Sequence, residues 1–119
     1  MAEQEMHEGG CHCGAVTYRA PVNLEAVMEC NCSHCQAKGF ILSFVPREQF
    51  ELVSGEDNLT EYRFNTHKLA HLFCKTCGVQ PFAYGTGPDG TEMAAVNVRT
   101  TTGVEPGDLK PQHVDGRNF

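Results

Sequence analysis

Residues 10–14 read Gly-Cys-His-Cys-Gly, and residues 74–78 read Cys-Lys-Thr-Cys-Gly. Each stretch places two thiols close together and follows the second thiol with a glycine. Zinc is bound by thiolates as a tetrahedron, and short spacers let one turn of backbone present two sulfurs to the same ion. The glycine allows the positive φ that such a sharp turn requires. The sequence therefore predicts one closed, structural zinc site on four thiols: Cys11, Cys13, Cys74 and Cys77.

A third stretch, residues 30–35, reads Cys-Asn-Cys-Ser-His-Cys and carries the remaining thiols. No glycine follows its cysteines, so it does not match the other two stretches. Three protein ligands with an open fourth position are the pattern of a catalytic zinc site. We predict such a site on Cys30, Cys32 and Cys35, so that two Zn²⁺ ions share the seven cysteines.

Other interpretations of these thiols stay open. An odd number of cysteines cannot pair fully in disulfides within one chain, and a reducing compartment keeps thiols free, which leaves disulfides or inert core cysteines as the minor alternative. The three-cysteine site is closed if His34, His71 or another side chain supplies a fourth ligand. His34 lies between two of the ligands and is either a proton shuttle or a histidine on a helix surface.

Length and composition limit the class of protein. The chain has 119 residues, which is one domain, here taken as residues 1–119. Its net charge is −6 and its basic residues are scattered, so we expect no nucleic-acid partner. The longest apolar run, residues 40–45, is too short to span a membrane. Residues 1–10 contain no apolar export signal, so we expect a cytoplasmic protein with reduced thiols.

The apolar pattern predicts an all-β fold of short antiparallel strands. One short helix is expected near the second cysteine cluster, over residues 33–38, with Ser33 as its N-cap and Gly39 after its end. Residues 1–9 and 103–119 are expected to be irregular tails. The expected strands lie over residues 13–19, 24–30, 40–45, 50–53, 59–64, 69–74, 79–84 and 91–98.

The charge of the three-cysteine site favours thiol chemistry. Three thiolates and Zn²⁺ sum to a charge of −1, so the ion polarises a carbonyl weakly but still favours a bound thiol as thiolate. A zinc deaminase is excluded, because its H-x-E and P-C-x-x-C motifs are missing. The alternatives to an enzyme are a non-catalytic, zinc-stabilised binding module and a thiol- or metal-buffering protein.

The three cysteine stretches, together with Phe73, Pro81-Phe82 and Val96-Asn97-Val98, resemble the glutathione-dependent formaldehyde-activating (Gfa-like) family along most of the chain. The resemblance implies a β-tent fold, a structural zinc on the four-cysteine set and a catalytic zinc on the three-cysteine set. It also implies a carbon–sulfur lyase, an S-(hydroxymethyl)glutathione synthase-like enzyme that adds glutathione to formaldehyde. The expected partners are therefore a small thiol, glutathione, and a small aldehyde.

The residues that would bind glutathione follow no motif in this sequence. Its carboxylates would require cations, for which Arg63, Lys68 and Arg99 are candidates, although charges of this kind are more often ordinary surface groups. Asn31 is either a donor to the substrate or a turn residue. His113 and Asp115 either close over the site or belong to an ordinary exposed tail.

Overall fold

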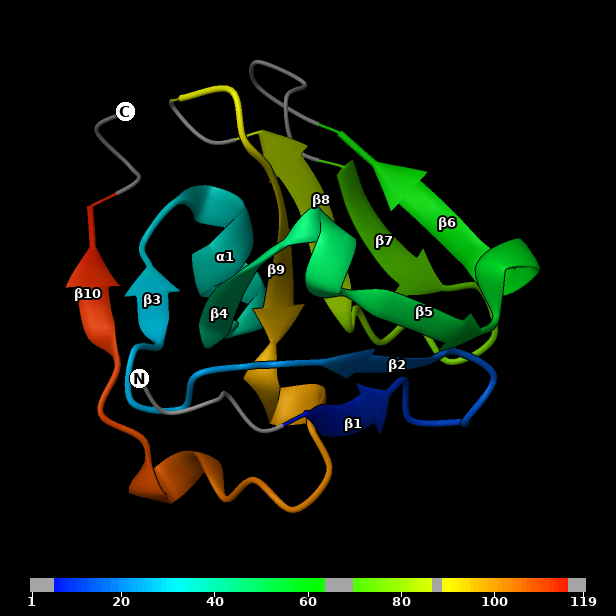
Figure 1. The fold of residues 1–119 in the computed structure, drawn as a ribbon, viewed down its shortest axis with the longest axis horizontal. Helices are drawn as coiled ribbons and strands as arrows, with labels where there is room; N and C mark the ends of the chain where they lie inside the picture. The colour runs from blue at the N-terminus through cyan, green and yellow to red at the C-terminus, as the bar shows by residue number, and fades with distance from the viewer. Residues whose placement is uncertain (1–5, 64–69, 87–88, 116–119) are drawn as a thin grey trace.

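The structure is a computed structural model that describes residues 6–63, 70–86 and 89–115 (Figure 1). These residues form two β-sheets and a single α-helix, with a few short 3-10 turns. The predicted all-β class and the helix beside the second cysteine cluster are both confirmed. Every helix in this part of the chain is too short or too polar to traverse a lipid bilayer.

The elements follow one another as short strands with brief connections. The strands are β1 (His7–Gly10), β2 (Thr17–Ala20), β3 (Met28–Cys30), β4 (Leu42–Pro46), β5 (Glu51–Ser54), β6 (Leu59–Tyr62), β7 (Ala70–Cys74), β8 (Phe82–Thr86), β9 (Glu92–Asn97) and β10 (Gln112–Val114). The helices are α1 (Ser33–Lys38) and the 3-10 turns η1 (Arg47–Gln49), η2 (Glu56–Asn58), η3 (Val98–Thr100) and η4 (Pro106–Asp108).

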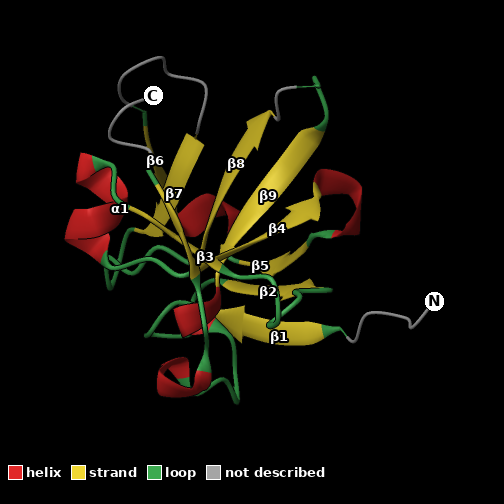
Figure 2. Ribbon diagram, turned by 90° about the vertical axis from the view of Figure 1, so that its left-hand side faces the viewer, coloured by secondary structure: helices red, strands yellow, loops and turns green. Residues whose placement is uncertain are grey.

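The smaller sheet has the order β1-β2-β5 and the larger sheet the order β10-β3-β4-β9-β8-β7-β6. All pairs are antiparallel except β10 with β3, which run parallel. Figure 2 shows strands β8, β9 and β4 of the larger sheet fanning out above β1 and β2. The fully buried side chains of Tyr18, from the smaller sheet, and Phe82, from the larger sheet, both pack on Phe50, with ring centroids 5.6 and 4.7 Å apart. The main core therefore lies between the two sheets.

The N-terminal tail was expected to be irregular through residue 9, but residues 7–10 form β1. Gly9 pairs with Tyr18 in the neighbouring strand. A Cβ on Gly9 would collide with the Tyr18 hydroxyl and the Thr100 carbonyl, so only glycine lets the strand lie this close. Gly-Gly is a poor strand former in isolation because it has no side chain. The close contact of Gly9 with Tyr18 and Thr100 requires that same absence of a side chain.

The C-terminal tail was also expected to be irregular, but residues 112–114 form β10. Its backbone hydrogen-bonds to the segment around β3: Gln112 N–H donates to the Val27 carbonyl, and Asn31 N–H donates to the Val114 carbonyl. Three residues carry no readable periodicity, so this parallel pairing depends on the tertiary position of β3.

Several strands begin later than expected, and for one of them a turn occupies the first residues. The strand expected over residues 24–30 is confined to β3, since Asn23 opens a turn in which its side chain accepts from Glu25 N–H and its carbonyl from Ala26 N–H. The strands β2, β4 and β8 likewise begin after the first residues of their expected ranges.

Helix α1 has the predicted length, but its N-cap differs from the prediction. The cap is Cys32, whose sulfur accepts a hydrogen bond from Cys35 N–H, and Ser33 is the first helical residue. Gly39 ends the helix in the left-handed conformation with φ 72°, as predicted. A cysteine thus takes the capping place that serine usually fills.

Candidate metal centres

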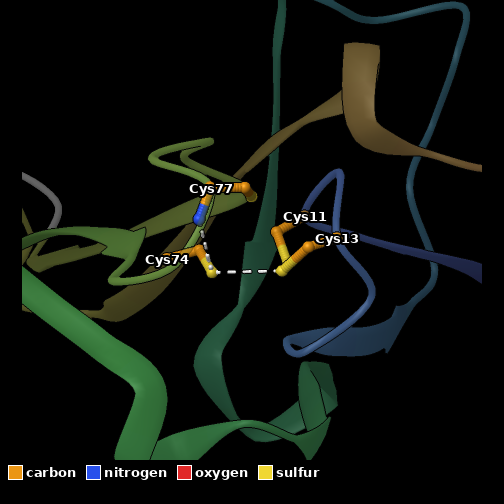
Figure 3. Close-up of side chains that lie close together, drawn as sticks. All are labelled: Cys11, Cys13, Cys74 and Cys77. Carbon is orange, nitrogen blue, oxygen red and sulfur yellow. Dashed lines mark hydrogen bonds between the residues drawn. The ribbon is translucent and has the colours of Figure 1, made fainter.

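The first cluster joins the two sheets. Cys11 and Cys13 lie in the turn between β1 and β2, and Cys74 and Cys77 lie at the end of β7 and in the turn that follows. Their four sulfurs lie within 4.8 Å of one another (Figure 3). The structure therefore brings together the four residues that the sequence grouped by their glycines.

Each of the two cysteine-containing turns, here called a knuckle, places backbone N–H groups against its sulfurs. Val16 N–H donates to Cys11 Sγ at 3.3 Å, and Thr76 N–H donates to Cys74 Sγ at 3.3 Å. Gly14 and Gly78 have φ values of 85° and 80°. A Cβ at either glycine would meet open space, so the turn needs glycine for its positive φ and not for close packing.

The sulfur separations fit a bound zinc ion and exclude disulfides. Cys13 Sγ lies 3.6 Å from Cys11 Sγ and 3.7 Å from Cys74 Sγ, whereas a disulfide bond is about 2.05 Å long. Sulfurs about 2.3 Å from a tetrahedral zinc ion lie about 3.8 Å from one another. These four residues fit a closed Cys₄ site.

The thiols of this cluster have pKa values that shift in opposite directions. The backbone N–H of Cys77, with that of Thr76, lowers the pKa of Cys74 to about 6. Against the N–H of Ala15, desolvation and the neighbouring thiols raise the pKa of Cys13 to about 11. The hydrogen bonds in this cluster therefore favour the thiolate at Cys74 and the thiol at Cys13. A bound zinc ion would favour the thiolate at all four residues.

The second cluster lies where β3 leads into α1. The sulfurs of Cys30, Cys32 and Cys35 lie within 4.8 Å of one another. Cys32 N–H donates to Cys30 Sγ at 3.4 Å, and Cys35 N–H donates to Cys32 Sγ at 3.3 Å. Burial and the neighbouring thiols raise the pKa of Cys35. Against burial, which alone would raise it, hydrogen bonds from Cys35, Cys30 and His34 together lower the pKa of Cys32. Among the described residues, no imidazole joins this group of ligand atoms.

A cavity of about 470 Å³ opens beside this cluster, between α1 on one side and β3 and β10 on the other. Cys30 and Cys35 contribute to its lining. The residues that the sequence left between a site role and an exposed tail, His113 and Asp115, also line it. Two thiols of the second cluster therefore line a cavity with space for a small molecule, whereas of the first cluster only Cys11 lines a neighbouring cavity, of about 420 Å³.

His34 lies away from this cavity, in a group of stacked rings between α1 and the larger sheet. Its ring centroid is 4.1 Å from that of His71 in β7 and 5.5 Å from that of Tyr62 in β6. His71 is buried, and its Nδ1 lies 3.0 Å from Gln80 Nε2. Burial, with a contribution from Lys38, lowers the pKa of His34. Its role as a proton shuttle stays a prediction.

Neither Arg63 nor Arg99, two of the three candidate glutathione-binding cations, lines the cavity. Arg63 pairs with Glu61 on the surface at 2.8 Å. Arg99 Nε donates to the carbonyl of Gly39, which lines the cavity, at 2.7 Å. Lys68 lies outside the described residues.

Two polar side chains that the sequence did not single out have clear places here. Glu29 lines the cavity, and Gln80 is buried against His71. In the sequence, one feature pointed to Glu29 as a site residue: it stands directly before the predicted ligand Cys30. No sequence feature pointed to Gln80, because its contact with His71 depends on the pairing of β7 with β8. Asn31, left open as a substrate donor or a turn residue, donates to Asp115 at 2.9 Å.

The comparisons with known proteins agree with this geometry. The family model described as glutathione-dependent formaldehyde-activating enzyme matches residues 6–115. The crystal structure of a Rhodobacter sphaeroides protein is similar, with a TM-score of 0.81 and 33% sequence identity. The match covers 90% of this chain and 99% of that one.

Proposed function

The chain belongs to the glutathione-dependent formaldehyde-activating family, and from this we propose that it is a carbon–sulfur lyase-type enzyme that adds glutathione, or a related small thiol, to formaldehyde or a related small aldehyde. The observation that carries this proposal is the cavity beside Cys30, Cys32 and Cys35. Cys30 and Cys35 both line this cavity, and a zinc ion held by three thiols would keep a fourth position open for a substrate thiol.

Two Zn²⁺ ions would be held by this chain. Cys11, Cys13, Cys74 and Cys77 would hold the structural ion, and Cys30, Cys32 and Cys35 would hold the other with three ligands. An ion with three thiolate ligands stabilises a fourth, incoming thiol as thiolate while leaving that sulfur nucleophilic. The reduced thiols that both sites require suit a cytoplasmic location.

The protein contributes proximity and orientation. The cavity holds the thiol and the aldehyde side by side, so that the reaction between two molecules becomes one within a complex. The backbone N–H groups of Cys32 and Cys35 keep the sulfurs of Cys30 and Cys32 in place. Preorganised donors of this kind do not have to reorient during the reaction.

The reaction requires one proton to move. The thiol gives up its proton, its sulfur forms a bond to the aldehyde carbon, and the π electrons of the carbonyl pass to oxygen. That oxygen then takes a proton, which yields S-(hydroxymethyl)glutathione from glutathione and formaldehyde. Water in the cavity is the proposed proton carrier, because His34, the candidate from the sequence, does not line the cavity; His34→Asn should therefore leave thiol binding unchanged and change the rate little.

Exchange NMR tests the activity on the zinc-loaded protein, because adduct formation also proceeds without a catalyst and product accumulation is uninformative. The exchange rate between formaldehyde and the glutathione adduct should rise above the uncatalysed rate with wild type and with Ser33→Ala, an exposed neighbour of the ligands. Cys32→Ser should return it to the uncatalysed value. An unchanged rate with wild type would contradict the proposal and favour a binding module or a thiol- or metal-buffering protein.

A further inference from the structure

Asn31 separates the first two thiols of the second cluster, and the C-terminal segment holds it at two points. Its backbone N–H donates to the Val114 carbonyl at 3.1 Å, where β10 pairs in parallel with β3. Its side-chain Nδ2 donates to Oδ1 of Asp115 at 2.9 Å. An ionised carboxylate only accepts hydrogen bonds, so this contact also fixes which end of the amide faces Asp115. Both the backbone and the side chain of Asn31 are therefore attached to the C-terminal segment.

The backbone at Asn31 sets the geometry of the thiols on either side of it. Cys32 N–H donates to Cys30 Sγ at 3.4 Å, and this N–H belongs to the planar peptide group that joins Asn31 to Cys32. A rotation of the Asn31 backbone would therefore turn the N–H away from the Cys30 sulfur. The next bond along the chain, from Cys35 N–H to Cys32 Sγ at 3.3 Å, depends in turn on where Cys32 lies. Holding Asn31 in place thus holds the arrangement of all three thiols.

The same attachment joins the thiols to the cavity beside them. Asn31, Val114 and Asp115 line this cavity together with two of the thiols, Cys30 and Cys35. Asp115 is exposed and lies 84 residues after Asn31 in the chain, so their contact exists only because β10 pairs with β3. Hydrogen-bonding groups behind metal ligands fix how those ligands point, and their loss commonly lowers metal affinity about 10–100-fold. The Asn31–Asp115 pair has the position of such a supporting group.

We infer that Asn31 is a positioning residue for the second metal site, and that its hydrogen bond to Asp115 holds the segment from Cys30 to Cys32 against β10. The inference deepens the proposed function and rests on it, because the ion on these thiols is the one that the substrate thiol would meet. With Asn31 held, the thiols keep their positions relative to the cavity wall. The ion and a substrate in the cavity then have a fixed arrangement, which is what catalysis by proximity requires.

The metal affinity of the second site tests this inference in the full chain. Zn²⁺ binding is measured by competition with a chromophoric chelator, and ligand geometry by the d–d bands of the cobalt-substituted protein. Asn31→Ala and Asp115→Ala each remove one partner of the hydrogen bond. Asp115→Asn removes the charge but keeps an acceptor oxygen, which separates the hydrogen bond from simple attraction between a carboxylate and the cation. The matched control is Gln112→Ala, which shortens an exposed side chain of β10 and keeps its backbone bond to Val27.

We expect Asn31→Ala and Asp115→Ala each to weaken Zn²⁺ binding at the second site about tenfold, and the double variant to be no weaker than either, because both remove the same bond. Asp115→Asn and Gln112→Ala should stay within about twofold of wild type. A bond with only a structural role would lower stability in urea and leave the affinity and the cobalt spectrum unchanged. That result, or an equal loss of affinity in Asp115→Asn and Asp115→Ala, would overturn the inference and leave the proposed function standing. A wild-type protein that binds a single ion would overturn both together.

Discussion

Substitution of Cys13 is the sharpest test of the four-cysteine site. Cys13 is exposed, so Cys13→Ser removes a ligand without opening a cavity in the core. The site joins the turn after β1 to the end of β7, and Cys13 and Cys74 are 61 residues apart in the chain. A cross-link that closes a loop of this length lowers the entropy of the unfolded chain by an amount worth about 4 kcal/mol at 25 °C.

That amount is a large part of the roughly 5–15 kcal/mol by which a domain is stable. We therefore expect Cys13→Ser to lower the free energy of unfolding by about 4 kcal/mol or to abolish cooperative folding. The measurement is urea unfolding of the zinc-loaded proteins, with metal content from native mass spectrometry. Cys32→Ser, at the second cluster, is the matched control and should change stability by about 1 kcal/mol or less.

Two results would refute the reasoning. The first is a Cys13→Ser variant that unfolds at the same urea concentration as wild type. The second is an equal loss of stability in Cys13→Ser and Cys32→Ser, which would mean that the two sites do not divide into a structural and a catalytic one. Removal of zinc from wild type by a chelator should reproduce the Cys13→Ser loss, because it opens the same loop.

Three further predictions concern the second cluster and its surroundings. Cys32→Ser should lower the metal content from two ions to one with the fold retained, and a variant that keeps both ions would contradict the division of ligands. Glutathione should increase the thiolate charge-transfer bands of the cobalt-substituted wild type but not those of Cys32→Ser, and equal spectra would place the thiol elsewhere. Burial, then His34 and Lys38, lowers the pKa of His71 to about 4. The imidazole of the unfolded chain, with a pKa of about 6.5, binds protons more tightly, so wild type should lose up to about 3 kcal/mol of stability as the pH falls from 6.5 to 4. His71→Gln should lack this loss in parallel unfolding curves.

The two groups of thiols that lie together could be predicted from the sequence because each contains thiols brought close by local geometry. Two thiols in one turn, followed by a glycine at positive φ, define a knuckle whatever the rest of the chain does, and Gly14 and Gly78 have that conformation. The same holds for α1, whose length and Gly39 terminus are local properties. The all-β class followed from short apolar runs separated by turns.

The boundary errors have a physical cause in the competition between turns and strands. Asn23 opens a hydrogen-bonded turn, which takes residues that the apolar pattern had assigned to a strand. Cys32 caps α1 in place of Ser33 because its sulfur, held within the cluster, already lies in line with Cys35 N–H. The side chains of Asn23 and Cys32 thus both accept a hydrogen bond from a backbone N–H, which composition alone does not reveal.

By itself the sequence determined the two thiol sets, the class of fold and the chemistry that three thiolates favour. Only the tertiary structure decided what surrounds the second set. It placed β10 beside β3, which made Glu29 and Asp115 part of a cavity wall, and it turned His34 toward His71 and away from that cavity. The reason is that strand pairing and cavity shape depend on hydrogen bonds and packing between residues far apart in the chain, such as Asn31 and Asp115, which no local pattern encodes.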